Sequence, residues 1–347
     1  MDKDDFKRAR LCSPEEINEI AELAWSQISS KPKTISVQSN IVKESNTVRI
    51  DNCEKHLEFC SANLPDFKSD SSSESSEDKD CEDAKLPLPE NERLKPSEFY
   101  EKYVARTKEE CEIELKAPQR SALWLEARKF CITASQFGAA IGESQYQTPD
   151  NLVKEKLWNS FVGNSATMWG NEHENHAKEA FCEWFSNTYA KQNEITEFEF
   201  IEENLVKFSE EPWMAVSPDG IIKYKKGNEI HYELVEFKCP AYYRNTAGHP
   251  YSKYSFNIPP YYKSQIQGIM GYFSRHHPLW KTSKCWFVVW QPHQTWITPH
   301  NFDPQYYETL HEKLQAWYFE KYLPALAHKF NGLLSIGDSR PSEPITV

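Results

Sequence analysis

Glu236 and Lys238, separated by a single residue, are the side chains whose types and spacing are best suited to chemistry. They lie in the segment ELVEFKCP, where most neighbouring residues are apolar. Side chains alternate between the two faces of a β-strand, so Glu236 and Lys238 would point to the same side. A carboxylate and an ammonium group are rarely buried unless they pair with each other or bind a metal ion. The segment therefore holds either a structural ion pair or part of a reaction centre.

Asp219 is a third polar residue near this strand, in the motif SPDG. Alone, the motif predicts a turn in which Asp219 bonds to its own backbone and Gly220 adopts a positive φ. Two expected helices add Glu174 and Gln265, each on a face that is otherwise apolar. Polar side chains that point inward from separate elements predict one common site.

Oxygen ligands of this kind suit Mg²⁺ or Mn²⁺. The expected ligands are the carboxylates of Asp219, Glu236 and Glu174, brought together around a shared ion, and the backbone carbonyl of Phe237. Lys238 and Gln265 would then position a water molecule for attack.

Four motifs, WGxxxE, SPDG, ExKCP and QxQ, follow one another in an order that resembles the phage lambda exonuclease, or YqaJ-type viral recombinase, family of the PD-(D/E)XK nucleases. Upstream, the segment SALWLEARKFCITASQFGAAIG is similar to the opening segment of that family. The resemblance covers Gln119 to Phe273. It implies a restriction-endonuclease-like core and a Mg²⁺-dependent deoxyribonuclease, with a pair of metal ions in its site. Such an enzyme hydrolyses duplex DNA from 5′ ends in recombination or repair, and a virus or a mobile element stays open as its source.

The resemblance also assigns roles to residues of the site. Asp219 and Glu236 would bind metal, and Glu174 would support a metal ion from its helix. Lys238 would orient or activate the attacking water, and Gln265 would complete the site. The family places a further acid about ten positions before SPDG, where Glu210 and Glu211 are the candidates in this chain.

Arg128, Thr133 and Ser135 match the positions that hold the 5′ phosphate of the DNA end in that family. We expect Ser135 to cap a helix whose free N–H groups suit a phosphate, with Arg128 as a bidentate donor. An ordinary helix cap and a surface ion pair are the alternative interpretations of these two residues.

Periodicity predicts the elements that must hold these residues. Helices are expected over 121–129, 135–141, 170–188, 260–273 and 304–327, and strands over 195–201, 213–217, 230–238, 285–290 and 295–298. This order predicts an α/β domain with a central mixed β-sheet flanked by helices. The last helix aligns a stripe of core residues, Tyr307, Leu310, Leu314, Trp317 and Tyr318.

The sequence divides into three regions. Residues 1–95 are expected to be largely disordered, with one amphipathic helix at about 14–28 and an acidic Ser-rich linker at 66–92. Residues 96–332 would form the nuclease domain, and residues 333–347 a flexible tail.

Composition limits the function classes. The net charge of −12 argues against electrostatic wrapping of nucleic acid, but residues 1–95 hold 21 acidic and 14 basic residues, against 31 and 26 in the remainder. The nine Cys residues form no CxxC pair, which disfavours a Cys-based zinc site or a disulfide framework. With no long apolar run, we expect an intracellular protein without a membrane segment, in the nucleus or the cytoplasm.

Several partners and alternatives follow. Double-stranded DNA ends are the expected substrate, with a recruiting or annealing protein at the N-terminal helix and a homotrimer as the assembly that the resemblance implies. An endonuclease or nickase that uses the same core stays open. So does a catalytically silent DNA-end-binding adaptor recruited through the N-terminal helix.

Overall fold

The computed structural model describes most of the chain after residue 86 and two short segments before it. The described residues are 41–44, 47–51, 87–117, 121–158, 165–240, 258–276, 283–292 and 294–339. They lie in one compact unit, Ser39–Val347. The predicted helix at 14–28, most of the predicted linker and residues 340–347 fall outside the described residues.

A mixed β-sheet forms the centre of this unit. Only β7 and β8 pair in parallel, and the other neighbours in the sheet are antiparallel. In sheet order the strands are β1 (Ile41–Glu44), β2 (Thr47–Asp51), β9 (Gln294–Asn301), β8 (Lys284–Gln291), β7 (Glu229–Lys238), β6 (Gly220–Lys226) and β4 (Ile195–Ile201). A second, parallel pair joins β3 (Ile132–Thr133) to β5 (Met214–Ala215).

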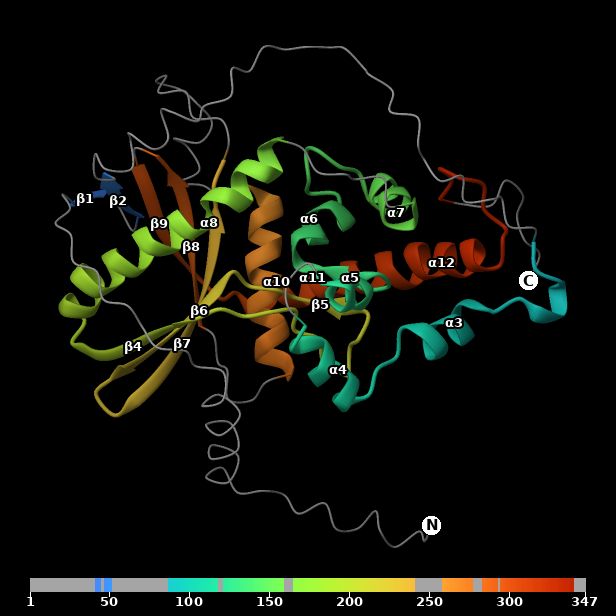
Figure 1. Cartoon of the computed structure of the whole chain (residues 1–347), viewed down its shortest axis with the longest axis horizontal. Coiled ribbons are helices and arrows are strands. Elements are labelled where there is room, and N and C mark those ends of the chain that lie inside the picture. The colour runs from blue at the N-terminus through green and yellow to red at the C-terminus, as the bar shows by residue number, and fades with distance from the viewer. Residues whose placement is uncertain are drawn as a thin grey trace, which may run out of the picture. The chain divides into compact units, whose positions relative to one another are not determined.

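Helices surround the sheet, as Figure 1 shows. Between β2 and α8 come η2 (Glu90–Glu92), α3 (Pro96–Tyr103), α4 (Lys108–Leu115), α5 (Ala122–Arg128), η3 (Ala134–Gln136), α6 (Phe137–Ala140) and α7 (Pro149–Trp158). The others are α8 (Ser165–Trp184), which continues as η4 (Phe185–Ala190), then α10 (Pro260–His276), α11 (Pro304–Trp317), η5 (Tyr318–Tyr322) and α12 (Leu323–Phe330). The central mixed sheet flanked by helices that the sequence predicts is confirmed. None of the described helices is long and apolar enough to cross a membrane.

Two long helices cover opposite faces of the sheet. On one face, Phe181 of α8 packs against Phe237 of β7, with ring centroids 6.2 Å apart. On the other face, Tyr262 of α10 lies 5.5 Å from the ring of Phe287, whose Cα partner in β7 is Glu236. Because side chains alternate along β7, this arrangement directs Glu236 and Lys238 toward α10.

The last helical segment packs as predicted. Tyr307, Leu310, Leu314, Trp317 and Tyr318 are all buried. The hydroxyl groups of η5 also reach the loop that follows α5. Tyr318 donates to the carbonyl of Phe130, and Tyr322 donates to that of Lys129 over 3.0 Å.

Two parts of the sheet differ from the expected elements. β6 begins at Gly220, directly after Asp219, where the sequence predicts a turn. The hairpin β1–β2 lies before residue 96, the expected start of the domain, and its second strand pairs with β9 through Val48↔Ile297. The sheet therefore includes residues upstream of the predicted domain.

Candidate active site

Glu236 lies at the centre of a buried polar cluster at the end of β7. The Lys238 ammonium group donates to Glu236 Oε1 over 2.5 Å. Gln265 of α10, also buried, donates to the same oxygen over 2.5 Å. The ammonium group also lies 5.0 Å from the ring centroid of Tyr262. The structure thus brings Glu236, Lys238 and Gln265 together, as the sequence predicts.

Asp219 joins this cluster across the sheet rather than through a turn. Its Oδ2 accepts a hydrogen bond from the backbone N–H of Phe237 over 2.7 Å. Gly220 has no positive φ, which corrects the turn expected for SPDG. A Cβ at Gly220 would lie only 2.0 Å from the Phe200 ring, so a glycine is needed here to leave room for that ring. The antiparallel pairing of Gly220 with Val235 then sets Asp219 beside Glu236.

Asp219 and Glu236 repel each other in a buried place. Burial first, and the neighbouring Asp219 charge second, raise the pKa of Glu236 to about 8. Burial likewise raises the pKa of Asp219. Burial disfavours the Lys238 ammonium group, but the two carboxylates outweigh that effect and raise the pKa of Lys238. The cluster holds two acids for one base, so it carries excess negative charge when both carboxyl groups are ionised.

One oxygen of this pair has no protein donor. Glu236 Oε2 is buried and finds no hydrogen-bond partner among the described residues. Two ionised carboxylates are both acceptors, so Asp219 could bond to Glu236 only while one of them holds a proton. A divalent cation would supply the missing partner and neutralise the repulsion, and hard oxygen donors suit Mg²⁺ or Mn²⁺. The Asp219–Glu236 pair therefore fits a divalent cation.

Glu174 lies near this pair but does not complete a ready-made metal site. A cavity of about 460 Å³ is lined by Glu174, Asp219 and Phe237, together with Lys116, Asn175, Lys178, Glu202, Glu203 and Asn204. Burial first, and the nearby Glu174 and Asp219 charges after it, raise the pKa of Cys239 to about 12. Within the described part of the chain, however, no three acidic, His or Cys side chains converge to hold a metal ion.

The physical reason is the alternation of β7. Glu236 faces α10, whereas Glu174 comes from α8 on the opposite face, where it meets Asp219 at the edge of the cavity. Among the described residues, the three predicted acids therefore do not converge on one point: Asp219 and Glu236 lie together, and Glu174 lines the cavity that Asp219 borders.

Glu203 is an acid of this cavity that the sequence analysis missed. It follows β4, lines the cavity with Asp219, and its pKa is raised to about 7 by burial. The two upstream candidates are placed elsewhere. Glu210 is exposed, and Glu211 contacts His276 and His311, each over 2.9 Å. The motif spacing pointed to residues 210–211, and no pattern in the sequence distinguishes Glu203 from its acidic neighbours.

Arg128 and Thr133 lie together, and Ser135 does not take its expected place. Arg128 Nη2 donates to Thr133 Oγ1 over 3.4 Å, and the guanidinium carbon lies 4.0 Å from the ring centroid of Trp124. Thr133, not Ser135, is the residue that precedes η3, and its backbone N–H and its hydroxyl group both donate to Gln136 Oε1, each over 3.2 Å. Ser135 is an exposed residue within the turn. The prediction of a Ser135 helix cap is wrong, because the helical turn begins one residue earlier.

The region around Arg128 is connected to the carboxylates through α10. A Cβ at Gly138 of α6 would lie 2.5 Å from Tyr261 Cα, so α6 lies directly against the first turn of α10. The adjacent Tyr262 and Gln265 contact Lys238 and Glu236. The two groups of predicted site residues therefore share one helix as their support.

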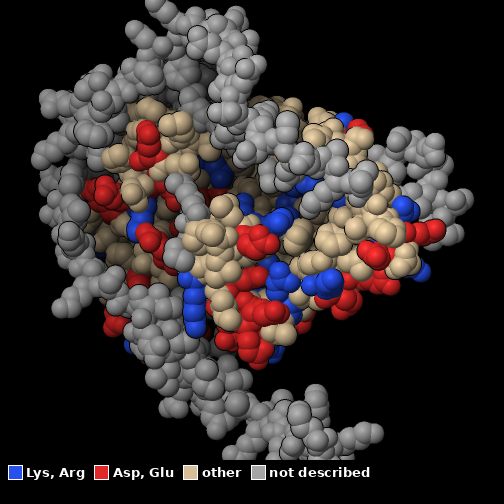
Figure 2. Space-filling model, turned by 45° about the vertical axis from the view of Figure 1, so that its right-hand side comes forward, with Lys and Arg blue, Asp and Glu red and all other residues tan. Residues whose placement is uncertain are grey.

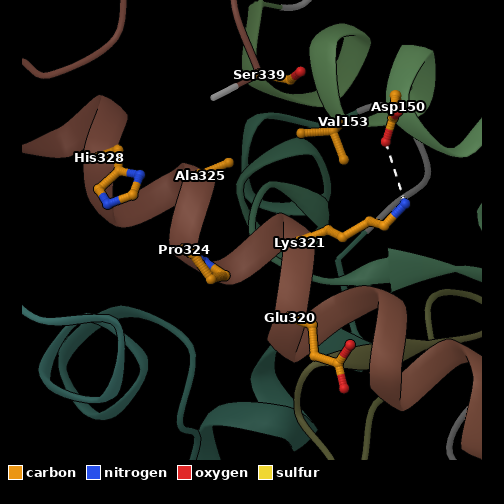
Figure 3. A pocket seen from close by; sticks show the side chains of 8 residues that line it. All are labelled: Asp150, Val153, Glu320, Lys321, Pro324, Ala325, His328 and Ser339. Atoms are coloured by element: carbon orange, nitrogen blue, oxygen red, sulfur yellow. Dashed lines mark hydrogen bonds and ion pairs between the residues drawn. The ribbon is translucent and has the colours of Figure 1, made fainter. Parts of the chain in front are cut away.

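A second cavity, of about 380 Å³, lies between α7 and the η5–α12 segment. Figure 3 shows its lining side chains, among which Lys321 Nζ points to Asp150 Oδ1 at 3.3 Å. It shares no residue with the cavity at Asp219 and offers no comparable pair of carboxylates.

The charge of the surface is uneven. In Figure 2, Lys and Arg side chains gather near the middle of the face shown, in and beside a hollow, and Asp and Glu side chains surround them. An acidic net charge is therefore compatible with a local cluster of basic side chains. Such a cluster attracts anions.

An Asp–Glu–Lys set with a buried Glu236 and partly exposed Asp219 and Lys238, at one end of a strand pair in a mixed sheet flanked by helices, is the arrangement that a resemblance to PD-(D/E)XK nucleases predicts. The model of the YqaJ-like viral recombinase domain matches residues 123–272, which include every residue predicted for the site.

Solved structures give a weaker likeness. An alkaline exonuclease, LHK-Exo from Laribacter hongkongensis, is 21% identical, with a TM-score of 0.43 over 60% of this chain and 96% of that one. LHK-Exo in complex with dAMP is 20% identical, with a TM-score of 0.41 over 59% and 93% of the two chains. None of the curated proteins compared with the chain matches it.

Proposed function

We propose that this protein is a Mg²⁺-dependent deoxyribonuclease that degrades duplex DNA from its 5′ ends. The observation that carries the proposal is the pairing of buried Glu236 with half-buried Asp219 beside Lys238, with the Glu236 Oε2 atom left without a donor among the described residues. The match of residues 123–272 to the YqaJ-like viral recombinase domain gives independent support.

Asp219 and Glu236 would hold the metal, with Mn²⁺ as the substitute for Mg²⁺. Glu174 and the Phe237 carbonyl are further ligand candidates on the cavity wall, where a second ion would bind. When bound, such ions neutralise charge on the phosphate and lower the pKa of a water molecule.

The residues of the chain then have separate tasks. Lys238 donates to Glu236 and keeps a positive charge beside the place where a phosphate would enter, so it can orient a water molecule and stabilise developing negative charge. Gln265 fixes Glu236 Oε1, which leaves Oε2 as the oxygen directed to a ligand. The Phe237 N–H holds Asp219 in the same way.

The proposed 5′ to 3′ direction rests on Arg128 and Thr133. A terminal phosphate carries more charge than an internal phosphodiester, and a guanidinium group beside a hydroxyl group is suited to bind it. The exposed Ser135 hydroxyl group is close enough in sequence to contribute a further donor.

Three substrates would test the proposal with Mg²⁺ present: linear duplex with a 5′ phosphate, the same duplex with a 5′ hydroxyl group, and closed circular DNA. Loss of the linear substrates alone, faster with the phosphate, is the expected result. Asp219→Asn keeps the shape of the side chain and should abolish the reaction, as should EDTA. Cleavage of circles would instead indicate a nickase, and binding without hydrolysis would indicate an adaptor.

The remaining expectations are proposals at the level of the whole protein. They are a homotrimer, a recruiting or annealing partner, a role in recombination or repair, and an intracellular, nuclear location. The three-substrate experiment bears on none of them.

A further inference from the structure

Lys156 of α7 lies in the same polar cluster as Arg128 and Thr133. Its ammonium group lies 3.4 Å from Gln136 Oε1, the oxygen that also accepts a hydrogen bond from Thr133 Oγ1 over 3.2 Å. Arg128 reaches Thr133 Oγ1 from the other side. Two cationic groups, from helices α5 and α7, are thus linked through one hydroxyl group and one amide.

Neither cation has an acidic partner within the described part of the chain, where no ion pair includes Arg128 or Lys156. The neighbouring Glu155 instead accepts a hydrogen bond from Gln147 over 2.6 Å. Aromatic rings take the remaining space. Lys156 Nζ lies 5.2 Å from the ring centroid of Tyr322, and Arg128 stacks on Trp124.

Another lysine of the same region shows the contrast. Lys207, which is buried, forms an ion pair with Glu114 over 2.8 Å and also donates to the carbonyl of Ala127 over 2.6 Å. Among the described residues, a carboxylate therefore pairs with the buried Lys207, and none pairs with Arg128 or Lys156. Half-buried cations beside each other are costly unless an anion joins them.

The structure also shows the cost of keeping this pair without an anion. Burial first, and the Arg128 charge as well, lower the pKa of Lys156 to about 8. Burial lowers the pKa of Arg128 too. A bound dianion would reverse both effects.

From these contacts we infer that Lys156 is a second cationic ligand for the terminal 5′ phosphate, opposite Arg128, and that Gln136 is the positioning residue that holds Lys156 toward it. The inference rests on the proposed function, and it assigns the preference for a 5′ phosphate to two cations from two helices. Arg128, Gln136 and Lys156 are each partly exposed, so a ligand can reach this cluster from the surface. The rigid support comes from Tyr322, which contacts Lys156 and also fixes the Lys129 carbonyl next to Arg128.

A binding experiment separates this inference from the nuclease activity. Full-length protein in EDTA, which cannot hydrolyse DNA by the proposed route, is titrated with blunt duplex that bears either a 5′ phosphate or a 5′ hydroxyl group. For wild type we expect tighter binding of the phosphorylated end. Lys156→Met should reduce this advantage about tenfold, the size typical of a lost charge-assisted hydrogen bond, and leave the affinity for the hydroxyl end nearly unchanged.

Lys154 provides the matched control. It lies on the same helix and is exposed, so Lys154→Met should keep the wild-type advantage. Lys156→Arg, which restores the charge, should recover most of it, and circular dichroism checks that each variant is folded. A Lys156→Met protein that is folded and keeps the full advantage would overturn the inference.

Together with the three-substrate hydrolysis assay, this binding experiment distinguishes the two proposals when either fails. A phosphate advantage that depends on Lys156, in a protein without Mg²⁺-dependent hydrolysis, would uphold the phosphate site and reject the nuclease. Hydrolysis with no contribution from Lys156 to the phosphate advantage would do the reverse.

Discussion

Two buried glutamates of strand β7 have opposite surroundings. Glu233 faces α8, and each of its oxygens has a donor: the Tyr224 hydroxyl group at 2.9 Å and the Lys284 ammonium group at 3.0 Å reach Oε1, and the Trp286 indole N–H at 2.6 Å reaches Oε2. Glu236, three residues later, faces α10 with two donors on one oxygen and no described donor on the other.

The difference in hydrogen-bond partners between Glu233 and Glu236 is a criterion that separates a structural carboxylate from a functional one. Buried acids that serve only the fold have their hydrogen bonds satisfied and their charge balanced. Glu233 meets both conditions through Lys284 and its aromatic neighbours. Glu236 meets neither, because it shares one ammonium group with Asp219 and keeps an oxygen free. An unsatisfied buried acid costs stability, and a ligand that supplies the missing charge recovers that cost.

The largest expected effect is on activity at Glu236. Glu236→Gln should reduce the rate of DNA hydrolysis roughly a thousandfold, because an amide supplies neither the charge nor the oxygen for a metal ion. The free energy of unfolding in EDTA should not fall, since the amide can donate to Asp219 while its oxygen still accepts from Lys238. Initial rates and urea unfolding measure the two quantities.

Glu229 offers a control on the same strand. Its side chain is exposed, so Glu229→Gln should change neither the rate nor the stability. A near-normal rate for the Glu236→Gln enzyme would show that Glu236, like Glu233, is a structural carboxylate and not part of the active site.

The next effect, at Glu233, should fall on stability. Glu233→Gln leaves the Lys284 ammonium group without its carboxylate and places an amide N–H₂ against other donors. We expect a loss of about 2 to 3 kcal/mol in the free energy of unfolding. The rate per folded molecule should stay near that of wild type. Thermal unfolding and rates corrected for the folded fraction test this, and a rate loss as large as that of Glu236→Gln would contradict the proposed division of roles.

The site was largely predictable, because its residues come from elements with clear periodicity. The alternation of residues 230–238 placed Glu236 and Lys238 on one face, and the apolar face of residues 260–273 placed Gln265 inward. Both predictions depend on the periodicity of side chains within a single strand or helix, which can be deduced from the sequence alone.

The predictions that fail all concern positions that are set by pairing between distant segments of the chain. The local motif predicts a turn around Asp219, whereas pairing of β6 with β7 begins at Gly220 and places Asp219 directly before the strand, beside β7. Glu203 follows β4 and reaches the cavity only because β4 pairs with β6. Thr133 precedes η3 because Ile132–Thr133 pairs with Met214–Ala215, and this extended segment ends two residues before the expected cap, Ser135.

The smallest effect concerns Glu211, a satisfied acid with two histidine partners. Burial alone would raise its pKa, but hydrogen bonds with His276 and His311 outweigh burial and lower the pKa to about 2 from 4.5. A depressed pKa contributes stability above the unfolded value of 4.5, and this contribution is lost as the pH falls through about 2. Glu211→Gln should therefore cost about 1 kcal/mol near pH 5, after allowance for the partial exposure of the pair. The difference in the free energy of unfolding between Glu211→Gln and wild type should shrink steadily toward pH 3.

Urea unfolding across this pH range measures that difference, with Glu210→Gln at the exposed neighbouring residue as the control. A constant difference between the two pH values would mean that Glu211 acts through packing, and that its histidine contacts, unlike the Lys284 contact of Glu233, carry no charge.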